Sequence, residues 1–341
     1  MSFAMIAPGG LNATTDHGKR RATGQNAVLR RPAFLSPLAA LLLPTLALAD
    51  PVQIAGPAGP LEAERVAVPG AAHALVIIPG SGPTDRDGNS PGLGMGSDTL
   101  RLLAEGLAAG GIASLRIDKR GFYGSEGAIA DPNDVTIAAY AEDARAWVAE
   151  AATLAPCVWL AGHSEGGLVA LAAAQEPPEA LCGLILLAAP GRPLGRIMME
   201  QVEANPANAP ILEEMRGLIE GLEAGQTRDP AAVSAPLQAL FTAGQQRYMM
   251  DLFAQEPAAL ATGWDGPALI VQGDRDIQIS TGDADLLAEA MPQAGRLPLP
   301  GGTHLLKEDV PGQPYATYLD PSLPLHPALV PGIVAFLDGV E

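Results

Sequence analysis

The stretch "CVWLAGHSEGGLVALAAA" (residues 157–174) contains the turn that decides the fold. Its first half is an apolar run that stops at Gly162, and its second half is an Ala/Leu-rich run that begins after two more glycines. A strand followed at once by a helix fits this pattern and leaves Ser164 in a very tight turn. Such a turn strains the backbone of the serine and holds its hydroxyl above the sheet edge. We expect glycine at Gly162 and Gly166 because a Cβ at either position would clash.

The rest of the chain alternates between strand-like and helix-like runs. The strand-like runs are continuously apolar, which is typical of a parallel sheet covered by helices on both faces. They are "HALVIIPG", "IASLRID", "CVWLAG", "CGLILLAAP", "PALIVQGD" and "GRLPLPGG". We therefore predict a doubly wound, mostly parallel α/β core formed by residues 50–190 and 264–341. In the helical run that follows "IASLRID", Asp134 is the expected N-cap.

Residues 191–263 break this rhythm because they contain no strand-like run. Their helical patterns predict a cap, or lid, inserted between two strands of the sheet. Two pairs of neighbouring methionines in this segment are candidates to line a pliable apolar cavity beneath the cap. They are Met198, Met199, Met249 and Met250. Ordinary packing between helices is the alternative explanation for any one of them.

A serine nucleophile needs a base, and four histidines follow residue 49. His163 adjoins Ser164, so its side chain must point away, and we expect it to be a packing residue. His73 lies at the start of a strand, away from the reacting edge, and His326 lies among prolines with no strand before it. His304 follows "GRLPLPGG", at the carboxyl edge where α/β sheets build their sites. We therefore predict His304 as the general base.

The base needs a carboxylate that fixes its tautomer. The segment "ALIVQGDRDIQIS" offers Asp274 and Asp276 just after the preceding strand. We predict Asp276 as the partner of His304, whereas Asp274 is expected to be a turn residue or an ion-pair partner of Arg275. The resulting chain order of Ser164, Asp276 and His304 is the order expected of a catalytic triad whose serine sits on a strand-to-helix turn.

Acyl transfer also needs two convergent N–H donors for the oxyanion of the tetrahedral intermediate. The backbone N–H of Glu165 is expected to be one of them, because the N-terminus of a helix carries partial positive charge. The loop "PGSGPTDRDGN" is expected to supply the other, with Ser81 as the first choice and Gly82 as the second. The acidic "DRDGN" lacks the ligand spacing of an EF-hand, so no metal site is predicted there.

Together these motifs resemble an α/β-hydrolase over nearly all of the chain beyond residue 49. More narrowly, five segments are similar to those of a bacterial esterase subfamily with a helical lid: "PGSGPTDRDGN", "LRIDKRGFYGSEG", "GHSEGG", "VQGDRDIQI" and "LPGGTHLLK". The resemblance implies a serine carboxylesterase that cleaves small-molecule esters through Ser164, Asp276 and His304, without a cofactor. It also implies oxyanion donors at the backbone of Ser81 and Glu165.

The chain departs from the usual pattern at one point and leaves other functions open. Pro79 and Gly80 stand where a His-Gly pair is usual before the oxyanion loop. Asp118 and Arg120 are expected to brace loops near the site rather than to react. An oligopeptidase, amidase or thioesterase of the same fold is the alternative enzyme. A lidded protein that binds a ligand without turnover is the alternative outside catalysis, although every catalytic position is filled.

The first 49 residues read as an export signal. A basic region precedes the apolar run "PAFLSPLAALLLPTLALAD", which contains a small-residue site at Ala47 and Ala49. Pro37 and Pro44 interrupt the run, so a lasting membrane anchor is the weaker interpretation. We expect the protein to be periplasmic or secreted, with no stable membrane anchor once the signal is removed. A disordered N-terminus with an apolar patch is the alternative.

The charge balance and the cysteines add two expectations. The chain has 20 Lys and Arg against 38 Asp and Glu, a formal net charge of −18, which excludes nucleic acid as a partner on electrostatic grounds. Its two cysteines, Cys157 and Cys182, each stand just ahead of an apolar strand-like run. If those strands are parallel neighbours, a disulfide between them is geometrically plausible in an oxidising compartment. Two buried thiols are the alternative.

Overall fold

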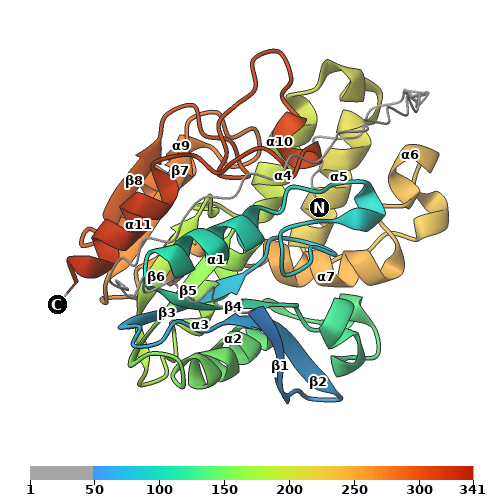
Figure 1. Ribbon diagram of the computed structural model, residues 1–341. Coiled ribbons are helices and arrows are strands. Elements are labelled where there is room, and N and C mark those ends of the chain that lie inside the picture. Colours follow the sequence, from blue (N-terminus) through green and yellow to red (C-terminus); the bar gives the residue numbers. More distant parts are fainter. Residues whose placement is uncertain (1–48, 341) are drawn as a thin grey trace, which may run out of the picture. The chain divides into compact units, whose positions relative to one another are not determined.

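A computed structural model describes residues 49–340, and within this range the chain forms an eight-stranded sheet (Figure 1). The predicted export signal lies, apart from Ala49, outside the described residues. The strands are β1 (Ala49–Ala55), β2 (Pro60–Val66), β3 (His73–Ile78), β4 (Ala113–Ile117), β5 (Cys157–His163), β6 (Leu181–Leu187), β7 (Ala268–Gly273) and β8 (Gly295–Leu299). Their order across the sheet is β1-β2-β4-β3-β5-β6-β7-β8.

The direction of the strands confirms the predicted mostly parallel sheet. The strands from β3 to β8 pair with one another in parallel, whereas β2 pairs antiparallel with both β1 and β4. The hairpin of β1 and β2 was not among the expected strands. In β1, exposed and half-buried residues alternate, so the continuous apolar signal of a buried strand is missing.

Helices cover both faces of the sheet, as predicted. Outside the segment between β6 and β7 they are α1 (Thr99–Ala109), α2 (Ile137–Ala151), α3 (Glu165–Ala173), α9 (Thr281–Ala290), α10 (Ala316–Leu319) and α11 (Leu329–Asp338). Short 3₁₀ helices are η2 (Pro91–Leu93), η3 (Tyr123–Ala128) and η4 (Pro132–Asp134). Helices α1 and α11 pack together against one face, and α2 and α3 pack on strands β3 and β5 from the other (Figure 1).

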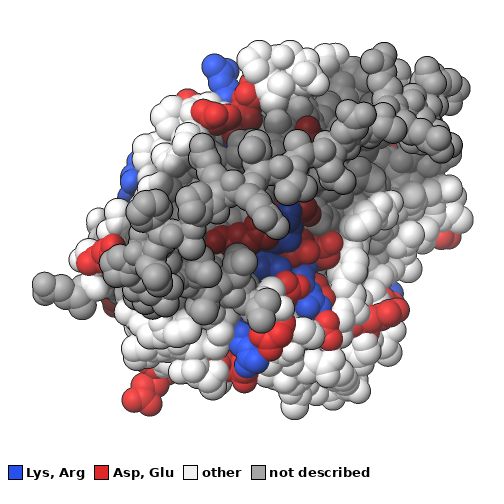
Figure 2. All heavy atoms as spheres, in the orientation of Figure 1, with Lys and Arg blue, Asp and Glu red and all other residues white. Residues whose placement is uncertain are grey.

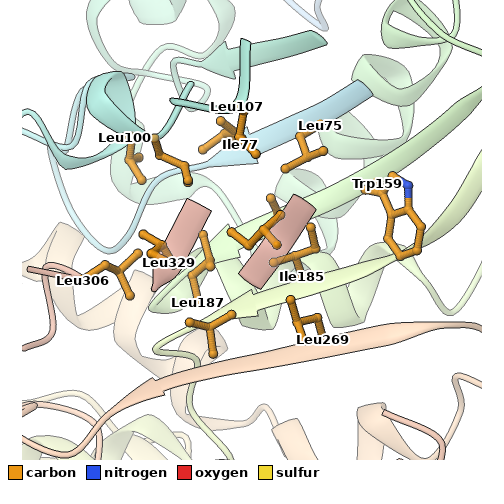
Figure 3. Packing of buried hydrophobic residues seen from close by; sticks show 14 of the residues in the cluster. Leu75, Ile77, Leu100, Leu107, Trp159, Ile185, Leu187, Leu269, Leu306 and Leu329 are labelled. Carbon is orange, nitrogen blue, oxygen red and sulfur yellow. The ribbon is translucent and has the colours of Figure 1, made fainter. Parts of the chain in front are cut away.

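The main hydrophobic core lies between the sheet and the pair α1 and α11. Figure 3 shows leucines of these helices meeting alternate residues of the central strands, such as Leu75 and Ile77 of β3. Trp159 of β5 and Ile185 of β6 continue the same layer and are fully buried. Alternate residues of each strand therefore fill this layer, and the continuous apolar runs reflect burial on both faces.

The segment between β6 and β7 is helical throughout, as its sequence indicates. It contains α4 (Leu194–Glu203), η5 (Pro206–Ile211), α5 (Leu212–Glu223), η6 (Pro230–Ala232), α6 (Ala235–Gln238), α7 (Ala243–Phe253) and α8 (Pro257–Ala261). Helices α4, α5 and α7 pack against one another, while α8 packs on α3 and α9 (Figure 1).

The start of α2 is where this inserted segment meets the core. Asp251 of α7 accepts a hydrogen bond from the backbone N–H of Ile137 at 2.7 Å. Arg247, also of α7, forms an ion pair with Asp134 at 2.6 Å. The N-cap of α2 is Thr136, whose side chain accepts from the N–H of Ala139, so the prediction of Asp134 as the cap was wrong. Thr136 has the extended backbone that a cap requires, which frees Asp134 to pair with the inserted segment.

The two cysteines lie at the amino ends of parallel neighbours. Strands β5 and β6 pair directly, and the structure joins Cys157 to Cys182 with a Cα–Cα separation of 5.5 Å. This spacing is the usual one for a disulfide. Among residues 49–340, no helix combines the length and the apolar character that a membrane span requires.

Candidate active site

Ser164 stands alone between the last residue of β5 and the first residue of α3. Its backbone has φ 55° and ψ −123°, a conformation that residues with a Cβ rarely adopt. A Cβ built on Gly162 would lie 2.1 Å from the carbonyl oxygen of Gly166, and one on Gly166 would lie 2.4 Å from that of Ile78. The glycines therefore permit the turn, as predicted, and the turn presents the Ser164 side chain at the carboxyl edge of the sheet.

His304 and Asp276 meet beside this serine. The Nδ1 of His304 lies 2.9 Å from Oδ2 of Asp276, and both side chains are buried. The other carboxylate oxygen of Asp276 accepts from the backbone N–H groups of Gln278 at 2.7 Å and Ile279 at 2.9 Å. These bonds hold the carboxylate still, so it favours the tautomer with the proton on Nδ1 and leaves Nε2 as the acceptor.

Asp274, the other candidate acid, is a turn residue. Its carboxylate accepts a hydrogen bond from the N–H of Gly301 at 2.7 Å, and its side chain is exposed. The structure therefore brings Asp276 to His304 and keeps Asp274 apart from it.

Ser164 and His304 line the same small cavity of about 70 Å³. Within residues 49–340 the Ser164 hydroxyl makes no hydrogen bond, to His304 or to any other group. Catalytic contacts are often loose before substrate binds and tighten in the reacting complex. The arrangement thus places the Ser164 hydroxyl and the oriented imidazole of His304 on one cavity wall.

His163 does more than fill space beneath the site. Its Nε2–H donates to the backbone carbonyl of His304 at 2.8 Å, and the two rings lie 4.8 Å apart. Burial, helped by the neighbouring His304, lowers the pKa of His163 to about 4. His163 is therefore a neutral donor that fixes the loop carrying His304, a role beyond that of the packing residue that we predicted.

The remaining two histidines lie in other parts of the fold, as expected. Nδ1 of His73 accepts from the indole N–H of Trp159 at 3.1 Å. Nε2 of His326 lies 3.0 Å from the carbonyl oxygen of Pro300. Neither of them lines the cavity that contains Ser164.

The predicted oxyanion donors lie on either side of Ser164. Ser81 lines the same cavity, and Glu165 is the first residue of α3. Neither backbone N–H donates to another described residue, so both are available to a ligand. A Cβ on Gly80 would approach that of Ser164 to 3.3 Å, which shows how closely the oxyanion loop passes the serine. Gly82, the second choice, lines the larger cavity described below but not the small one.

A buried lysine that the sequence reasoning missed lies behind these donors. Lys119 is 2% exposed, and its ammonium donates to the carbonyl of Gly80 at 2.6 Å and to Oε1 of Glu165 at 3.0 Å. Burial disfavours the charge on Glu165, whereas the ammonium of Lys119 and the hydroxyl of Tyr248 favour it, and the pKa of the carboxyl lies below its usual range. The sequence feature that could have indicated this ion pair is a lysine directly after the strand-like run "IASLRID" together with an acid directly after Ser164.

Two tyrosines surround this ion pair. The ammonium of Lys119 lies 5.1 Å from the ring centre of Tyr140, within the range of a cation–π contact. Tyr248, from α7, has a buried hydroxyl close enough to interact with the carboxylate of Glu165. Burial and that negative charge raise the pKa of Tyr248 well above its usual value. The hydroxyl is therefore protonated and faces the charge as a neutral dipole.

Asp118 and Arg120 have the bracing positions that were expected of them. Asp118 pairs with Arg86 of the oxyanion loop, and it also accepts from the N–H of Gly124 at 3.0 Å. Arg120 pairs with Asp143 of α2 at 2.7 Å. Neither lines the cavities that contain Ser164.

The acidic residues of "DRDGN" are likewise engaged within the protein. Asp85 accepts from the backbone N–H groups of Asp87 and Asn89, and Asp87 pairs with Arg116 at 3.0 Å. Across residues 49–340 there is no group of three or more potential ligands that could hold a metal ion.

A second, larger cavity of about 390 Å³ is also lined by Ser164. Helices α4 and α7 supply much of its apolar wall, through Leu194, Ile197, Met198, Met249 and Leu252. One methionine of each predicted pair, Met198 and Met249, therefore faces the cavity, whereas Met199 and Met250 do not line it. Among the described residues that line it, the only carboxylate belongs to Glu165, which forms an ion pair with Lys119.

Comparison with known proteins supports this reading of the fold. A family model described as serine aminopeptidase, S33, matches residues 90–309. Esterase EstD from Thermotoga maritima is 27% identical over 220 residues, which are 62% of this chain and 48% of that protein. The chain therefore spans about half the length of this curated relative.

Two solved structures show the same fold at low sequence identity. Est1E from Butyrivibrio proteoclasticus, solved with ferulic acid, is 18% identical, with a TM-score of 0.53 over 82% of this chain and 95% of its own. A thermophilic esterase from Thermogutta terrifontis is 19% identical, with a TM-score of 0.52 over 86% and 99%.

The family match covers more than half of the chain and includes Ser164, Asp276 and His304. The mostly parallel sheet, with a serine on the sharp turn between β5 and α3, is the architecture that such a match requires. The chain belongs to the serine aminopeptidase S33 family and has the α/β-hydrolase fold.

Proposed function

We propose that the protein is a carboxylesterase that works through an acyl-enzyme. The observation that carries this proposal is the hydrogen bond that His304 donates to Asp276 beside the strained Ser164. An oriented imidazole next to a half-buried hydroxyl that lines a cavity at the sheet edge is the arrangement needed to activate a nucleophile. The curated relative named as an esterase supports the same activity.

The reaction proceeds in two halves. In the first, Oγ of Ser164 attacks the ester carbonyl while Nε2 of His304 takes the hydroxyl proton, and the N–H groups of Ser81 and Glu165 stabilise the oxyanion. The intermediate collapses when His304 gives that proton to the leaving alcohol. In the second, water attacks the acyl group while His304 takes a proton from that water. His304 then returns the proton to Oγ of Ser164 as the carboxylic acid leaves.

The larger cavity favours esters over peptides with a free amino terminus. An aminopeptidase must bind an ammonium group, which calls for an unpaired carboxylate or a comparable acceptor. Within residues 49–340, Glu165 is the only carboxylate that lines either cavity, and it is paired with Lys119. The apolar wall from α4 and α7 suits an uncharged hydrocarbon group instead.

The position of His304 assigns the two halves of the substrate. His304 must protonate the oxygen of the leaving alcohol, so the alcohol has to lie close to His304. Of the two cavities, His304 lines only the small one, which is therefore the site of the alcohol. The acyl chain then extends into the larger cavity. The preferred substrates are accordingly esters of an apolar acid with a small alcohol.

The test compares matched substrates and a matched variant. The wild-type protein should hydrolyse p-nitrophenyl octanoate with a burst of p-nitrophenol and should leave L-alanine p-nitroanilide almost untouched. Ser164→Ala should lose at least about 1000-fold in kcat and should no longer react with a fluorophosphonate probe. Rapid cleavage of the anilide, or unchanged ester turnover in Ser164→Ala, would contradict the proposal.

Export to the periplasm or the medium is part of the same proposal. The disulfide between Cys157 and Cys182 supports it, because such bonds persist mainly in oxidising compartments. Expression of the full chain, followed by cell fractionation and mass measurement of the amino terminus, tests it. A cytosolic protein that retains its first residues would contradict the assignment.

A further inference from the structure

Lys119 contacts the peptide group that carries one of the two oxyanion donors. Its ammonium lies 2.6 Å from the carbonyl oxygen of Gly80. That carbonyl and the N–H of Ser81 belong to the same peptide unit, because the carbonyl carbon of Gly80 is bonded to the nitrogen of Ser81. A hydrogen bond to the oxygen end of this planar unit therefore fixes the direction of its N–H.

The same ammonium also contacts the residue that carries the second donor. Lys119 lies 3.0 Å from Oε1 of Glu165, whose backbone N–H is the other donor. The side chain of Glu165 is fully buried, and no other charged side chain described in the structure forms an ion pair with it. One cation thus joins the oxyanion loop after β3 to the first residue of α3.

We propose that Lys119 is a positioning residue for the oxyanion hole, acting through the Gly80–Ser81 peptide and through Glu165. This inference rests on the proposed function, because an oxyanion forms only if the chain performs acyl transfer. Lys119 does not touch the reacting atoms.

Two physical effects give Lys119 this role. Its hydrogen bonds set the two donors before substrate arrives, so no reorganisation is needed when charge develops. A cation on the carbonyl oxygen also polarises the peptide and strengthens its N–H as a donor, an effect that is larger at a buried position than in water. Both effects act on the charged transition state more than on the neutral ester, so they should appear in kcat rather than in KM.

The competing explanation is that Lys119 only neutralises Glu165. Removing Lys119 alone would leave a buried unpaired carboxylate, which destabilises a protein whatever its catalytic role. Glu165→Gln removes that charge and leaves the bond from Lys119 to Gly80 available. The informative comparison is therefore Lys119→Met/Glu165→Gln against Glu165→Gln alone, because a buried carboxylate is absent from both.

The experiment measures turnover of p-nitrophenyl octanoate and inhibition by octyl trifluoromethyl ketone. This ketone adds the serine hydroxyl and forms a tetrahedral oxyanion, so its Ki reports on the hole directly. We expect kcat of the double variant to fall at least about tenfold below that of Glu165→Gln, with KM within about twofold, since losing one donor outright costs about 100-fold or more. The Ki should rise by the same factor as kcat falls. Thermal melting of both variants checks that they fold equally well.

The outcomes separate this inference from the proposed function. If the wild-type protein is active and the double variant matches Glu165→Gln in kcat and Ki, Lys119 has no positioning role although the esterase assignment stands. A loss confined to KM, with Ki unchanged, also overturns the inference. An inactive wild-type protein would overturn the proposed function and this inference together. Lys119→Gln, which keeps an N–H donor without the charge, should recover part of the lost kcat if orientation contributes beside polarisation.

Discussion

At the scale of single residues, the turn at Ser164 depends on the absence of two side chains. We predict that Gly162→Ala lowers the free energy of unfolding by about 3 kcal/mol or more, because its Cβ would lie 2.1 Å from the backbone oxygen of Gly166. Gly217→Ala in α5 is the control, since a Cβ there meets only Arg228 at 3.6 Å. That change should stabilise the helix by about 0.5–1 kcal/mol. Chemical denaturation of the two variants checks both values.

His163 gives the protein a measurable dependence of stability on pH. Its pKa is about 4 in the folded chain against a usual 6.5, so the unfolded chain binds the proton more readily between these values. Stability should therefore fall as the pH is lowered from about 6.5 to about 4, by about 3 kcal/mol from this group. Urea denaturation over this range, compared with His163→Gln, measures the contribution. Parallel pH curves for the two proteins would show that His163 carries no such linkage.

Single residues also show how far the site could be predicted. Ser164, Asp276 and His304 could be named because each follows a strand-like run and chain order assigns their roles. Lys119 also follows a strand-like run, but its contact with Gly80 and that of His163 with His304 could not be predicted, because both contacts are made to backbone carbonyls far away in the chain. Sequence patterns indicate which side chains exist at an edge, but not which carbonyl oxygens they meet.

At the scale of helices and strands, burial decided what could be predicted. The strands from β3 to β7 are buried on both faces and were recognised as continuous apolar runs. The hairpin of β1 and β2 lies at the edge of the sheet, where one face is more open, and was missed. The cap of α2 was placed on Asp134 instead of Thr136, because an acid and a hydroxyl two residues apart are equally good caps by sequence.

The disulfide between β5 and β6 should stabilise the fold without entering the chemistry. It joins cysteines separated by 25 positions in the sequence, for which the chain-entropy estimate is about 3.5 kcal/mol. We expect a reducing agent to lower the melting temperature of the wild-type protein and to leave that of Cys157→Ser/Cys182→Ser unchanged. If reduction has no effect on the wild-type melting temperature, the cross-link is absent or adds nothing.

Helix α7 should control the length of the acyl group. Leu252 is buried in the wall of the larger cavity, so Leu252→Trp would fill part of it. We expect the ratio of kcat/KM for methyl octanoate to that for methyl acetate to fall at least about tenfold. Ala254→Trp, at the exposed end of the same helix, is the control and should keep the ratio.

The same wall predicts which isomer the wild-type protein prefers. Methyl octanoate and heptyl acetate have the same atoms, but they place the hydrocarbon chain on opposite sides of the ester. Acid release followed in a pH-stat should favour methyl octanoate by about tenfold or more. A preference for heptyl acetate would reverse the assignment of the two cavities while leaving the esterase function intact.

At the scale of the whole molecule, the excess of acidic residues should influence which substrates arrive. In the middle of the face shown in Figure 2, basic side chains lie beside acidic ones rather than in a patch of their own. Ion pairs of this kind join Arg65 to Asp50 and Arg86 to Glu62 in the first strands and the oxyanion loop. The net charge of −18 is therefore not offset by a region that would attract anions there.

This charge predicts a difference between two similar esters. Monomethyl suberate carries a carboxylate at the end of its acyl chain, whereas methyl octanoate is neutral. We expect kcat/KM for the anionic ester to be the lower and to rise several-fold between about 0.02 and 0.5 M salt, while that for the neutral ester stays within about twofold. A salt response shared by both esters would point to a cause other than charge.

The two ends of β5 carry different features, a disulfide at the amino end and the candidate nucleophile after the carboxyl end. Cys157 opens the strand at one end, and the serine follows its last residue at the other, about 20 Å away for a strand of seven residues. The covalent cross-link and the proposed reacting group thus lie at opposite edges of one sheet. Environments that cut the sulfur bridge should shorten the working lifetime of the molecule while each surviving copy turns over at its original speed.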